Sequence, residues 1–393
     1  MPFNLNPIAA HAAAAATAGG AGARARARAF PAQPGVHGPG PLLRRAGPSG
    51  WPAWAPRWIR RLPLTLPRFQ LGGSRAVTAL MVGPRCAVVR LEARPDGLHL
   101  VAAAEGEAEA LASWKPLFRG SKGVLVLRSE ERFLQTLDKP EVPDADLALA
   151  VRWPMGEALG TDAEQLLTTA LPLPRPSEAM RPQVLGIATR LDAIQAQLAA
   201  LRDAGIDIRS IDIVDSALRG MALLQPVLPA STVAVCLVGQ SVSIGLIQQG
   251  RMCALRSVPL PRRDGHADQE LAEQLALHTR RTFDHYERQA LLSQRAGDGS
   301  AMVAVGRTLA SVGSLSQAGL DTFTSALPES PQRFDVAEAL LGSEELHRRC
   351  AGHDELTALA CVAAARLFDT GGAAPHAAAA GADPNPTTTQ ALS

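Results

Sequence analysis

A strand-turn-strand unit occurs twice in this sequence, and it restricts the possible folds more than any other feature. Residues 79–83 (ALMVG) and 235–239 (VCLVG) are apolar runs that end in glycine, where the chain reverses at once. Two further apolar segments follow each run across short turns, which predicts a three-stranded antiparallel meander in both places. Two copies of one unit indicate a duplicated domain with a cleft between its halves.

The segments between and after the two meanders predict an α/β protein. Apolar runs bounded by glycine and proline indicate strands, and apolar residues at helical spacing indicate helices. We expect, in chain order, a strand at 123–128, a short helix at 142–153 that Pro154 ends, a strand at 184–188, a helix at 191–204, a strand at 206–214, a helix at 216–224 and, after the second meander, a long helix at 268–294.

The first 70 residues contain nine arginines and neither aspartate nor glutamate. Subtracting these nine charges from the formal net charge of +2 leaves −7 for the rest of the chain. The segment is rich in alanine, glycine and proline, carries tryptophans at 51, 54 and 58, and has no periodicity, which predicts a disordered arm. Its arginines and indoles suit contact with anionic lipid. The other interpretation is a start codon assigned too far upstream.

The cysteines and histidines argue against a disulfide framework and a metal centre. The five cysteines form no CxxC pair and mostly have apolar neighbours, which is typical of buried thiols in a reducing compartment. His278 and His285 lie seven residues apart on one predicted helix without further ligands nearby, so no metal is expected there. No apolar run is long and hydrophobic enough to predict a membrane span.

Five stretches, in order along the chain, resemble the MshI and PilM families of pilus biogenesis proteins. They are residues 133–144, residues 150–153 with an Arg-Trp pair, residues 204–206, residues 211–219, and residues 280–289 in the long helix. The resemblance covers residues 75 to 369. It implies the actin-like fold, related to ribonuclease H, that these families share with the cell-division protein FtsA.

The resemblance also implies an order of domains. A duplicated, two-lobed α/β fold with an inserted small subdomain would lie between two disordered tails. We expect a disordered arm at 1–74, the opening part of the first lobe at 75–128, the inserted partner-binding subdomain at 129–183, the connection between the lobes at 184–230, the second lobe at 231–369 and a disordered tail at 370–393.

In the actin-like fold, the first turn of each meander carries an Asp-x-Gly motif. The turn amides hold phosphate, the glycine permits close approach, and the aspartate orients Mg²⁺. Setting Gly83 over Gly239 places Met81 and Leu237 at the two aspartate positions. Neither side chain can bind Mg²⁺ or activate water. The resemblance therefore implies a pseudo-ATPase without catalytic residues.

The remaining nucleotide elements are also incomplete. The fold places a Gly-Gly turn against adenosine, and the best match has a single glycine, Gly306, followed by Arg307. What remains is a vestigial cofactor site at Gly83, Arg85, Gly239 and Gly306. No cofactor is expected, although Arg85 leaves weak residual binding of ATP possible because a guanidinium can hold phosphate without a metal.

By resemblance, the partner is the cytoplasmic tail of an inner-membrane PilN-like protein, which docks against the inserted subdomain. Arg152 and Trp153 are the predicted partner-binding residues, with the alternative that Trp153 fills the core beneath its helix. The favoured function is a non-catalytic scaffold of MSHA-type type IV pilus biogenesis in the cytoplasm, peripheral to the inner membrane. The alternatives are an active actin-like ATPase and a protein that binds membrane or nucleic acid through its basic arm, although nucleic acid is not expected.

Overall fold

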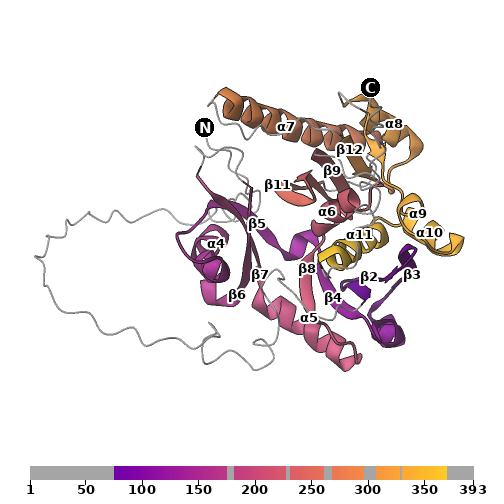
Figure 1. Ribbon diagram of the computed structural model, residues 1–393. Coiled ribbons are helices and arrows are strands. Elements are labelled where there is room, and N and C mark those ends of the chain that lie inside the picture. Colours follow the sequence, from indigo (N-terminus) through magenta and orange to yellow (C-terminus); the bar gives the residue numbers. More distant parts are fainter. Residues whose placement is uncertain are drawn as a thin grey trace, which may run out of the picture.

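The computed structural model describes residues 75–174, 181–226, 231–260, 268–295, 307–327 and 330–369, with side chains up to residue 288 in the helix at 268–295. The expectations for the arm at 1–74 and the tail at 370–393 concern residues outside these ranges. Within them, no helix is both long and apolar enough to cross a membrane. Two larger sheets flank a pair of helices, and a smaller sheet projects to one side (Figure 1).

The first large sheet has the strand order β3-β2-β1-β4-β8. The strand β1 pairs antiparallel with β2 and parallel with β4. All six residues of β1 are buried, because helices cover both faces of this sheet, as is usual next to a parallel neighbour. The strands are β1 (Ala76–Met81), β2 (Cys86–Arg94), β3 (Gly97–Gly106), β4 (Lys122–Leu127) and β8 (Ser210–Ile213).

The second large sheet repeats this arrangement in the order β11-β10-β9-β12-β13. Here β9 takes the place of β1, since it pairs antiparallel with β10 and parallel with β12. The predicted duplication is therefore confirmed. The strands are β9 (Ser231–Val238), β10 (Ser241–Gln248), β11 (Arg251–Pro259), β12 (Arg307–Ser311) and β13 (Gln332–Arg333).

The small subdomain consists of a three-stranded antiparallel sheet, β5-β7-β6, with short helices packed against it. Its strands are β5 (Phe133–Asp138), β6 (Leu166–Pro172) and β7 (Gln183–Arg190). Because β7 is the central strand, the subdomain continues beyond the boundary expected at residue 183. The strand at 184–188 was correctly predicted, but its pairing with β5 and β6 is a long-range feature that periodicity does not reveal.

The helices and 3-10 helices (η) cover the sheets. They are η2 (Ala108–Ala110), α2 (Leu111–Trp114), η3 (Lys115–Phe118), η4 (Ser129–Glu131), η5 (Asp144–Asp146), α3 (Leu147–Ala150), α4 (Arg152–Leu159), η6 (Ala163–Gln165), α5 (Leu191–Asp203), α6 (Ser216–Leu223), α7 (Asp268–Arg295), α8 (Gln317–Ser325), α9 (Val336–Ala339), α10 (Glu344–Ala351) and α11 (Asp354–Asp369).

The predicted C-terminal end of the helix at 142–153 was wrong. Pro154 does not stop it, since Pro154 is the third residue of α4. Proline is tolerated in the first turn of a helix, where its missing N–H would have no partner within the helix. The helix ends instead at Gly160, which adopts a φ of 62° and closes it in the left-handed conformation.

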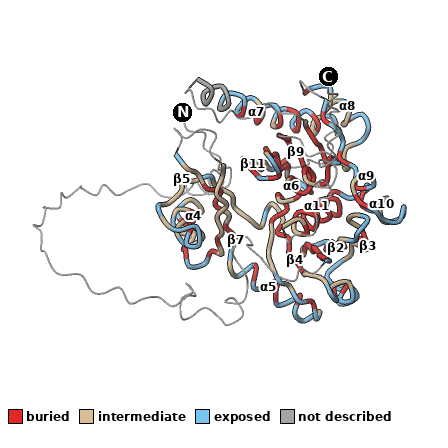
Figure 2. Tube along the Cα trace, in the orientation of Figure 1, coloured by how far each residue is buried: buried red, intermediate tan, exposed pale blue. Residues whose placement is uncertain are grey.

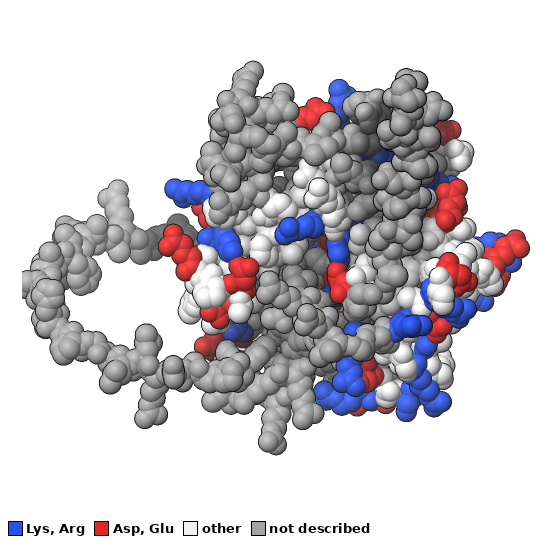
Figure 3. Space-filling view, in the orientation of Figure 1, with Lys and Arg blue, Asp and Glu red and all other residues white. Residues whose placement is uncertain are grey.

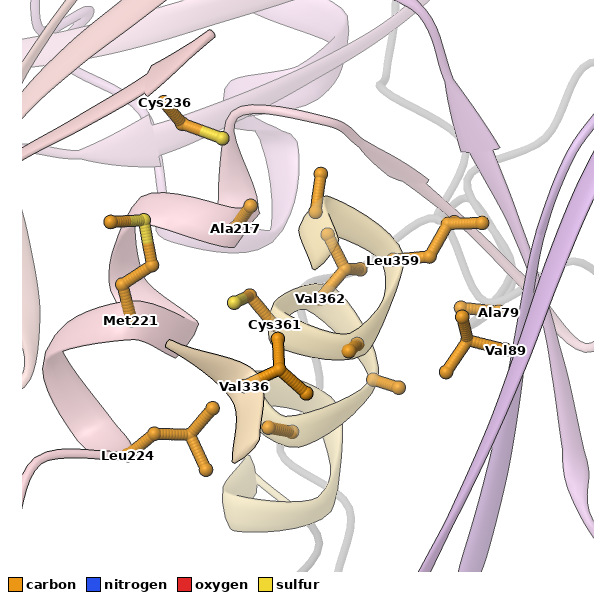
Figure 4. Close-up of a cluster of buried hydrophobic side chains, with 14 of the residues drawn as sticks. Ala79, Val89, Ala217, Met221, Leu224, Cys236, Val336, Leu359, Cys361 and Val362 are labelled. Carbon is orange, nitrogen blue, oxygen red and sulfur yellow. The ribbon is translucent and has the colours of Figure 1, made fainter. Parts of the chain in front are cut away.

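The helices α6 and α11 lie between the two large sheets. Nearly the whole length of α11 is buried (Figure 2). Its Leu359 points toward Ala79 and Val89 of the first sheet, while Cys361 points toward Met221 of α6 (Figure 4). Although α11 follows the second lobe in sequence, it packs against β1 and β2 as well, so the second lobe expected at 231–369 contributes its last helix to both halves.

The crossing of α6 and α11 depends on a glycine. A Cβ atom added to Gly220 would lie 1.9 Å from the carbonyl oxygen of Cys361, far inside van der Waals contact. The neighbouring positions of α11 are mostly alanines. Small residues on both helices therefore let two backbones touch at the centre of the molecule.

We predict that Gly220→Ala destabilises the protein by about 3 kcal/mol or more, because the helices must move apart and open the core. Urea unfolding followed by circular dichroism measures this effect. Gly352→Ala is the matched control, since its Cβ would meet backbone atoms only at 3.7 Å, and its effect should stay within about 0.5 kcal/mol. Equal stability of the Gly220→Ala variant and the parent would contradict this packing.

Candidate functional site

Two glycine turns lie at the carboxyl ends of equivalent strands. Gly83 follows β1, and Gly239, with a φ of 59°, lies in the turn between β9 and β10. Since β4 runs parallel to β1 and β12 runs parallel to β9, the segments after β4 and β12 begin at the same end of each sheet as the glycine turns. In open α/β sheets this edge is where ligands bind. It is therefore where a vestigial nucleotide site has to be sought.

The first turn of α11 connects the two lobes at this edge. Glu355 forms an ion pair of 3.7 Å with Arg128, the residue after β4. The preceding residue, Asp354, accepts hydrogen bonds from Ser314 in the segment after β12. Two consecutive carboxylates thus reach different lobes, and their negative charges complement the N-terminal end of the helix dipole.

The side chain of Arg128 occupies the space beside the first glycine turn. Its Nε lies 2.9 Å from the position of a Cβ on Gly83, and its Nη2 donates a 2.5 Å hydrogen bond to the carbonyl oxygen of Arg85. The side chain of Arg85 is exposed. Two guanidinium groups therefore lie at a turn whose amides would hold phosphate. They can attract an anion, but they cannot bind Mg²⁺.

A buried carboxylate lies at the same end of the sheets. Asp354 is 6% exposed, and its Oδ1 has no hydrogen-bond partner in the described structure. Burial raises the pKa of Asp354, whereas the hydrogen bonds from Ser314 oppose this rise. The nearby thiol of Cys236, in β9, also has a raised pKa, because it is buried and lies close to Asp354. Cys236 is therefore a neutral thiol rather than a thiolate.

The predicted equivalence of Met81 and Leu237 was wrong, because the two side chains lie on opposite faces of their sheets. Met81 lies in the core between the sheets, together with Cys236 and Val238. Leu237 lies on the opposite face of its sheet, under α7. A shift of one residue moves a side chain to the other face of a strand, and the two turns differ in length. The residues near the end of β9 are apolar or thiol-bearing in either register.

The position of the third nucleotide element was also wrong. Gly306 itself lies outside the described residues, but the next residue, Arg307, starts β12 and pairs with Thr232 near the beginning of β9. This is the edge opposite to Gly239. The turn at the correct edge follows Ser311 and contains Gly313. A Cβ on Gly313 would lie 3.1 Å from Asp354 Oδ1, so this glycine lies beside the first turn of α11.

We predict that Asp354→Asn stabilises the protein at neutral pH by about 1 kcal/mol, since it removes a buried charge. The raised pKa means that the folded state binds the Asp354 proton more tightly than the unfolded state. The parent should therefore recover stability relative to the variant as the pH falls through the folded pKa toward the ordinary aspartate value. Urea unfolding at several pH values tests this. A stability difference that is independent of pH, or that grows on acidification, would contradict it.

A second site is a cavity of about 360 Å³ between the small sheet and the two lobes, which we call the groove. Its walls come from β6 and β7, from β8, from the start of α6, from the turn and strand at β11, and from the end of α11. The strands β6, β8 and β11 are each the last strand of their sheet. Edge strands leave backbone N–H and C=O groups unpaired on one side.

The charged residues in the wall of the groove, apart from Arg251, are compensated within the protein. Asp212 pairs with Arg366, and Arg219 pairs with Asp369 at 2.7 Å. Arg219 also donates to the carbonyl oxygen of Gly250 in the turn between β10 and β11. The remaining wall is mainly aliphatic. The groove therefore offers apolar surface and backbone groups, with an exposed charge at Arg251.

A buried ion pair fixes the subdomain relative to both lobes. Arg132, just before β5, makes a bidentate contact with Asp215 at 2.7 and 2.8 Å. Ser243 of β10 donates to the same carboxylate, and Ser257 of β11 accepts from Arg132. Both charged side chains are almost completely buried, so the loss of one partner would leave an uncompensated charge. Asp215 also lines the groove.

The two predicted partner-binding residues have different environments. Arg152 is engaged within the subdomain, since its guanidinium donates to the carbonyl oxygens of Glu164 and Leu166 and ties α4 to β6. Trp153 is 69% exposed, so it does not fill the core beneath its helix. Neither residue is part of the groove wall.

Several functional candidates were missed by sequence reasoning. Arg128, Arg132 and Asp215 meet their partners across long stretches of sequence, and no local pattern marks them. Asp354 and Glu355 had a usable signal, because two acidic residues before an alanine-rich apolar run indicate the start of a buried helix. Among the described residues, no group of three or more histidines, cysteines, aspartates and glutamates is arranged to hold a metal ion.

Comparisons with known proteins identify the fold. No family model matches the chain, and no curated protein matches its sequence. A solved structure described as a PilM-PilN type IV pilus biogenesis complex is similar, with a TM-score of 0.56 and 18% identity, over 74% of this chain and 98% of that chain.

Two further solved structures are more distant. The cytoplasmic domain of EpsL, an inner-membrane component of the type II secretion system of Vibrio cholerae, has a TM-score of 0.37 and 14% identity, over 51% of this chain and 73% of that chain. A protein of unknown function with an actin-like ATPase fold from Bacteroides thetaiotaomicron has a TM-score of 0.39 and 9% identity, over 68% of this chain and 93% of that chain. The duplicated sheets with the small inserted sheet form an actin-like fold.

Proposed function

We propose that this chain is a non-catalytic scaffold of type IV pilus assembly, of the MSHA type by its sequence resemblance, whose groove binds the cytoplasmic tail of an inner-membrane PilN-like protein. The groove carries the proposal, because a concave and mainly apolar site next to three edge strands suits an extended peptide. The likeness to the PilM-PilN structure supports the choice of partner. In this role the chain acts in the cytoplasm at the inner membrane.

The chemistry of the groove indicates how a tail would bind. An extended peptide can add to β6 or β8 through backbone hydrogen bonds and place alternate side chains on the aliphatic wall. Since the wall charges other than Arg251 are compensated internally, charged side chains of the tail would gain little over the rest of the wall. We expect the tail to contribute apolar side chains to the groove, and its specificity to depend on their shape.

The contacts of Arg152 and Trp153 with the partner remain a prediction. Arg152 would have to give up its hydrogen bonds to Glu164 and Leu166 to reach a partner, so we give it a structural role in α4. Trp153 is free to contact a partner, but only outside the groove. The predicted contact between the arm at 1–74 and anionic lipid is a separate possibility, which binding of the full chain to anionic vesicles would test.

We propose further that the cleft does not hydrolyse ATP. The strand end that precedes Gly83 carries Met81, the end of β9 is apolar, and Arg128 lies beside the first turn. One observation favours the alternative of an active or nucleotide-binding protein, namely the carboxylates of Asp354 and Glu355 at the start of α11. We give the scaffold preference because both carboxylates already bind groups of this chain.

We predict that Thr169→Arg weakens binding of the partner tail at least about tenfold, because a long cationic side chain would fill the groove beside β6. Fluorescence anisotropy with a labelled peptide of the cytoplasmic tail of the PilN-like protein from the same organism measures the affinity. Thr136→Arg is the matched control, since Thr136 is exposed on β5 at the other edge of the same sheet. Equal affinities for both variants would refute the groove as the docking site.

We also predict that isothermal titration calorimetry with Mg-ATP shows no binding in the micromolar range, and that no Mg-dependent phosphate release occurs. The physical reason is the lack of a carboxylate at Met81 and at the end of β9, so that no side chain there can bind Mg²⁺. Asp354→Ala serves as the comparison, because any residual activity that runs through this carboxylate would disappear in that variant. Micromolar affinity that requires Mg²⁺ would overturn the prediction.

A further inference from the structure

An exposed apolar surface lies on the small subdomain away from the groove. Trp153 is 69% exposed and Leu149 is 59% exposed, which makes them the two most exposed large hydrophobic residues of the described structure. They lie four residues apart on the nearly continuous helical path of α3 and α4, where hydrogen bonds from Val151 to Leu147 and from Met155 to Val151 carry the helical pattern across the junction. Residues at this spacing are neighbours on one helix face.

Acidic residues flank this pair along the same face. Asp146 precedes Leu149 by three residues and Glu157 follows Trp153 by four, so the order along the stripe is acid, leucine, tryptophan, acid. Both carboxylates are exposed, and no ion pair is found for either of them within the described structure. We call these four residues the Trp153 surface.

The surroundings of the Trp153 surface are also acidic. Glu141, Asp162 and Glu164 are exposed on the same subdomain, and Figure 3 shows acidic side chains over this part of the molecule, with basic ones between them. The basic residues of the subdomain are engaged elsewhere. Lys139 pairs with Asp144, and Arg152 binds backbone carbonyls. An occupant of this surface should therefore combine hydrophobic with positively charged side chains.

We propose that the Trp153 surface is the docking site of the chain's own segment at 51–69. This segment has the required chemistry, since it contains Trp51, Trp54 and Trp58, several aliphatic residues and four arginines, but no acidic residue. An arginine of the segment can stack on the exposed Trp153 ring while it pairs with Asp146 or Glu157. The indoles of the segment can cover Leu149 and Trp153 and remove their apolar area from water.

The length of the connecting chain permits this contact. Residues 59–74 separate Trp58 from the first described residue, and an extended chain of this length spans about 50 Å. A folded unit of about 300 residues has a radius of gyration of about 19 Å. The extended linker is therefore about as long as the folded unit is wide, which lets the tryptophan segment contact surface well away from residue 75.

The charge pattern argues against the two other occupants. An anionic lipid surface would be repelled by Asp146, Glu157 and the neighbouring carboxylates. The proposed binding site of the partner tail is the groove, and its wall contains none of the four residues of the Trp153 surface. The exclusion of the tail from this surface rests on the proposed function, whereas the charge and apolar chemistry that favour the chain's own segment do not.

The test uses ¹⁹F nuclear magnetic resonance of the full chain with 5-fluorotryptophan, in which Trp153→Phe identifies the resonance of Trp153. In the combined variant Arg57→Ser, Arg60→Ser and Arg61→Ser, the Trp153 resonance should move toward its solvent-exposed position. The combined variant Asp146→Asn and Glu157→Gln should produce the same shift. High salt should do so in the parent, because the contact is electrostatic and lies at the surface.

The matched control is the combined variant Arg24→Ser, Arg26→Ser and Arg28→Ser, which removes the same charge from a part of the arm without tryptophan and should leave the Trp153 resonance unchanged. The buried Trp114 should keep its resonance in every variant and thus report an intact fold. A Trp153 resonance that is the same in all variants would overturn the proposal. Two other results would also overturn it. If the difference between the parent and the arginine variant vanishes on dilution, the occupant is the arm of a second copy. If the difference appears only with anionic vesicles, the occupant is lipid.

Discussion

The close contact between α6 and α11 holds this structure together. Because Gly220 lets the α6 backbone touch the carbonyl of Cys361, the two helices form one thin layer on which both large sheets pack. The helix α11 contributes to both candidate sites. Its first turn places Asp354 and Glu355 against the segments that follow β12 and β4, and its last turns carry Arg366 and Asp369 into the wall of the groove.

This arrangement explains how a scaffold can retain the architecture of a nucleotide-binding protein. The ion pair between Arg128 and Glu355, together with the hydrogen bonds from Ser314 to Asp354, connects the lobes through groups of the chain itself. In our proposal these contacts hold the two lobes in one relative geometry without a bound ligand. The groove then has a fixed shape, because the Arg132 to Asp215 pair also ties the small subdomain to α6.

The sequence predicted the duplicated meanders well because glycine turns and apolar runs are local signals. The helices at 191–204 and 268–294 were likewise found from periodicity, close to the observed α5 and α7. Pairing across the chain was not predictable in this way. The central place of β7, the opposite faces of Met81 and Leu237, and the position of Arg128 beside Gly83 depend on contacts between distant segments. The exposure of Trp153 was unpredictable for the same reason, because tertiary packing decides whether a tryptophan on a helix is buried.

The most direct test of the scaffold function is site-specific photo-crosslinking of the full chain in membranes that contain the PilN-like protein. A photoreactive phenylalanine analogue at position 169, in the groove, should crosslink to the cytoplasmic tail of that protein with equal yield in the presence and absence of Mg-ATP. The same analogue at position 136, at the other edge of the small sheet, should not crosslink. Crosslinking that requires Mg-ATP, or that occurs from position 136 and not from position 169, would contradict the account.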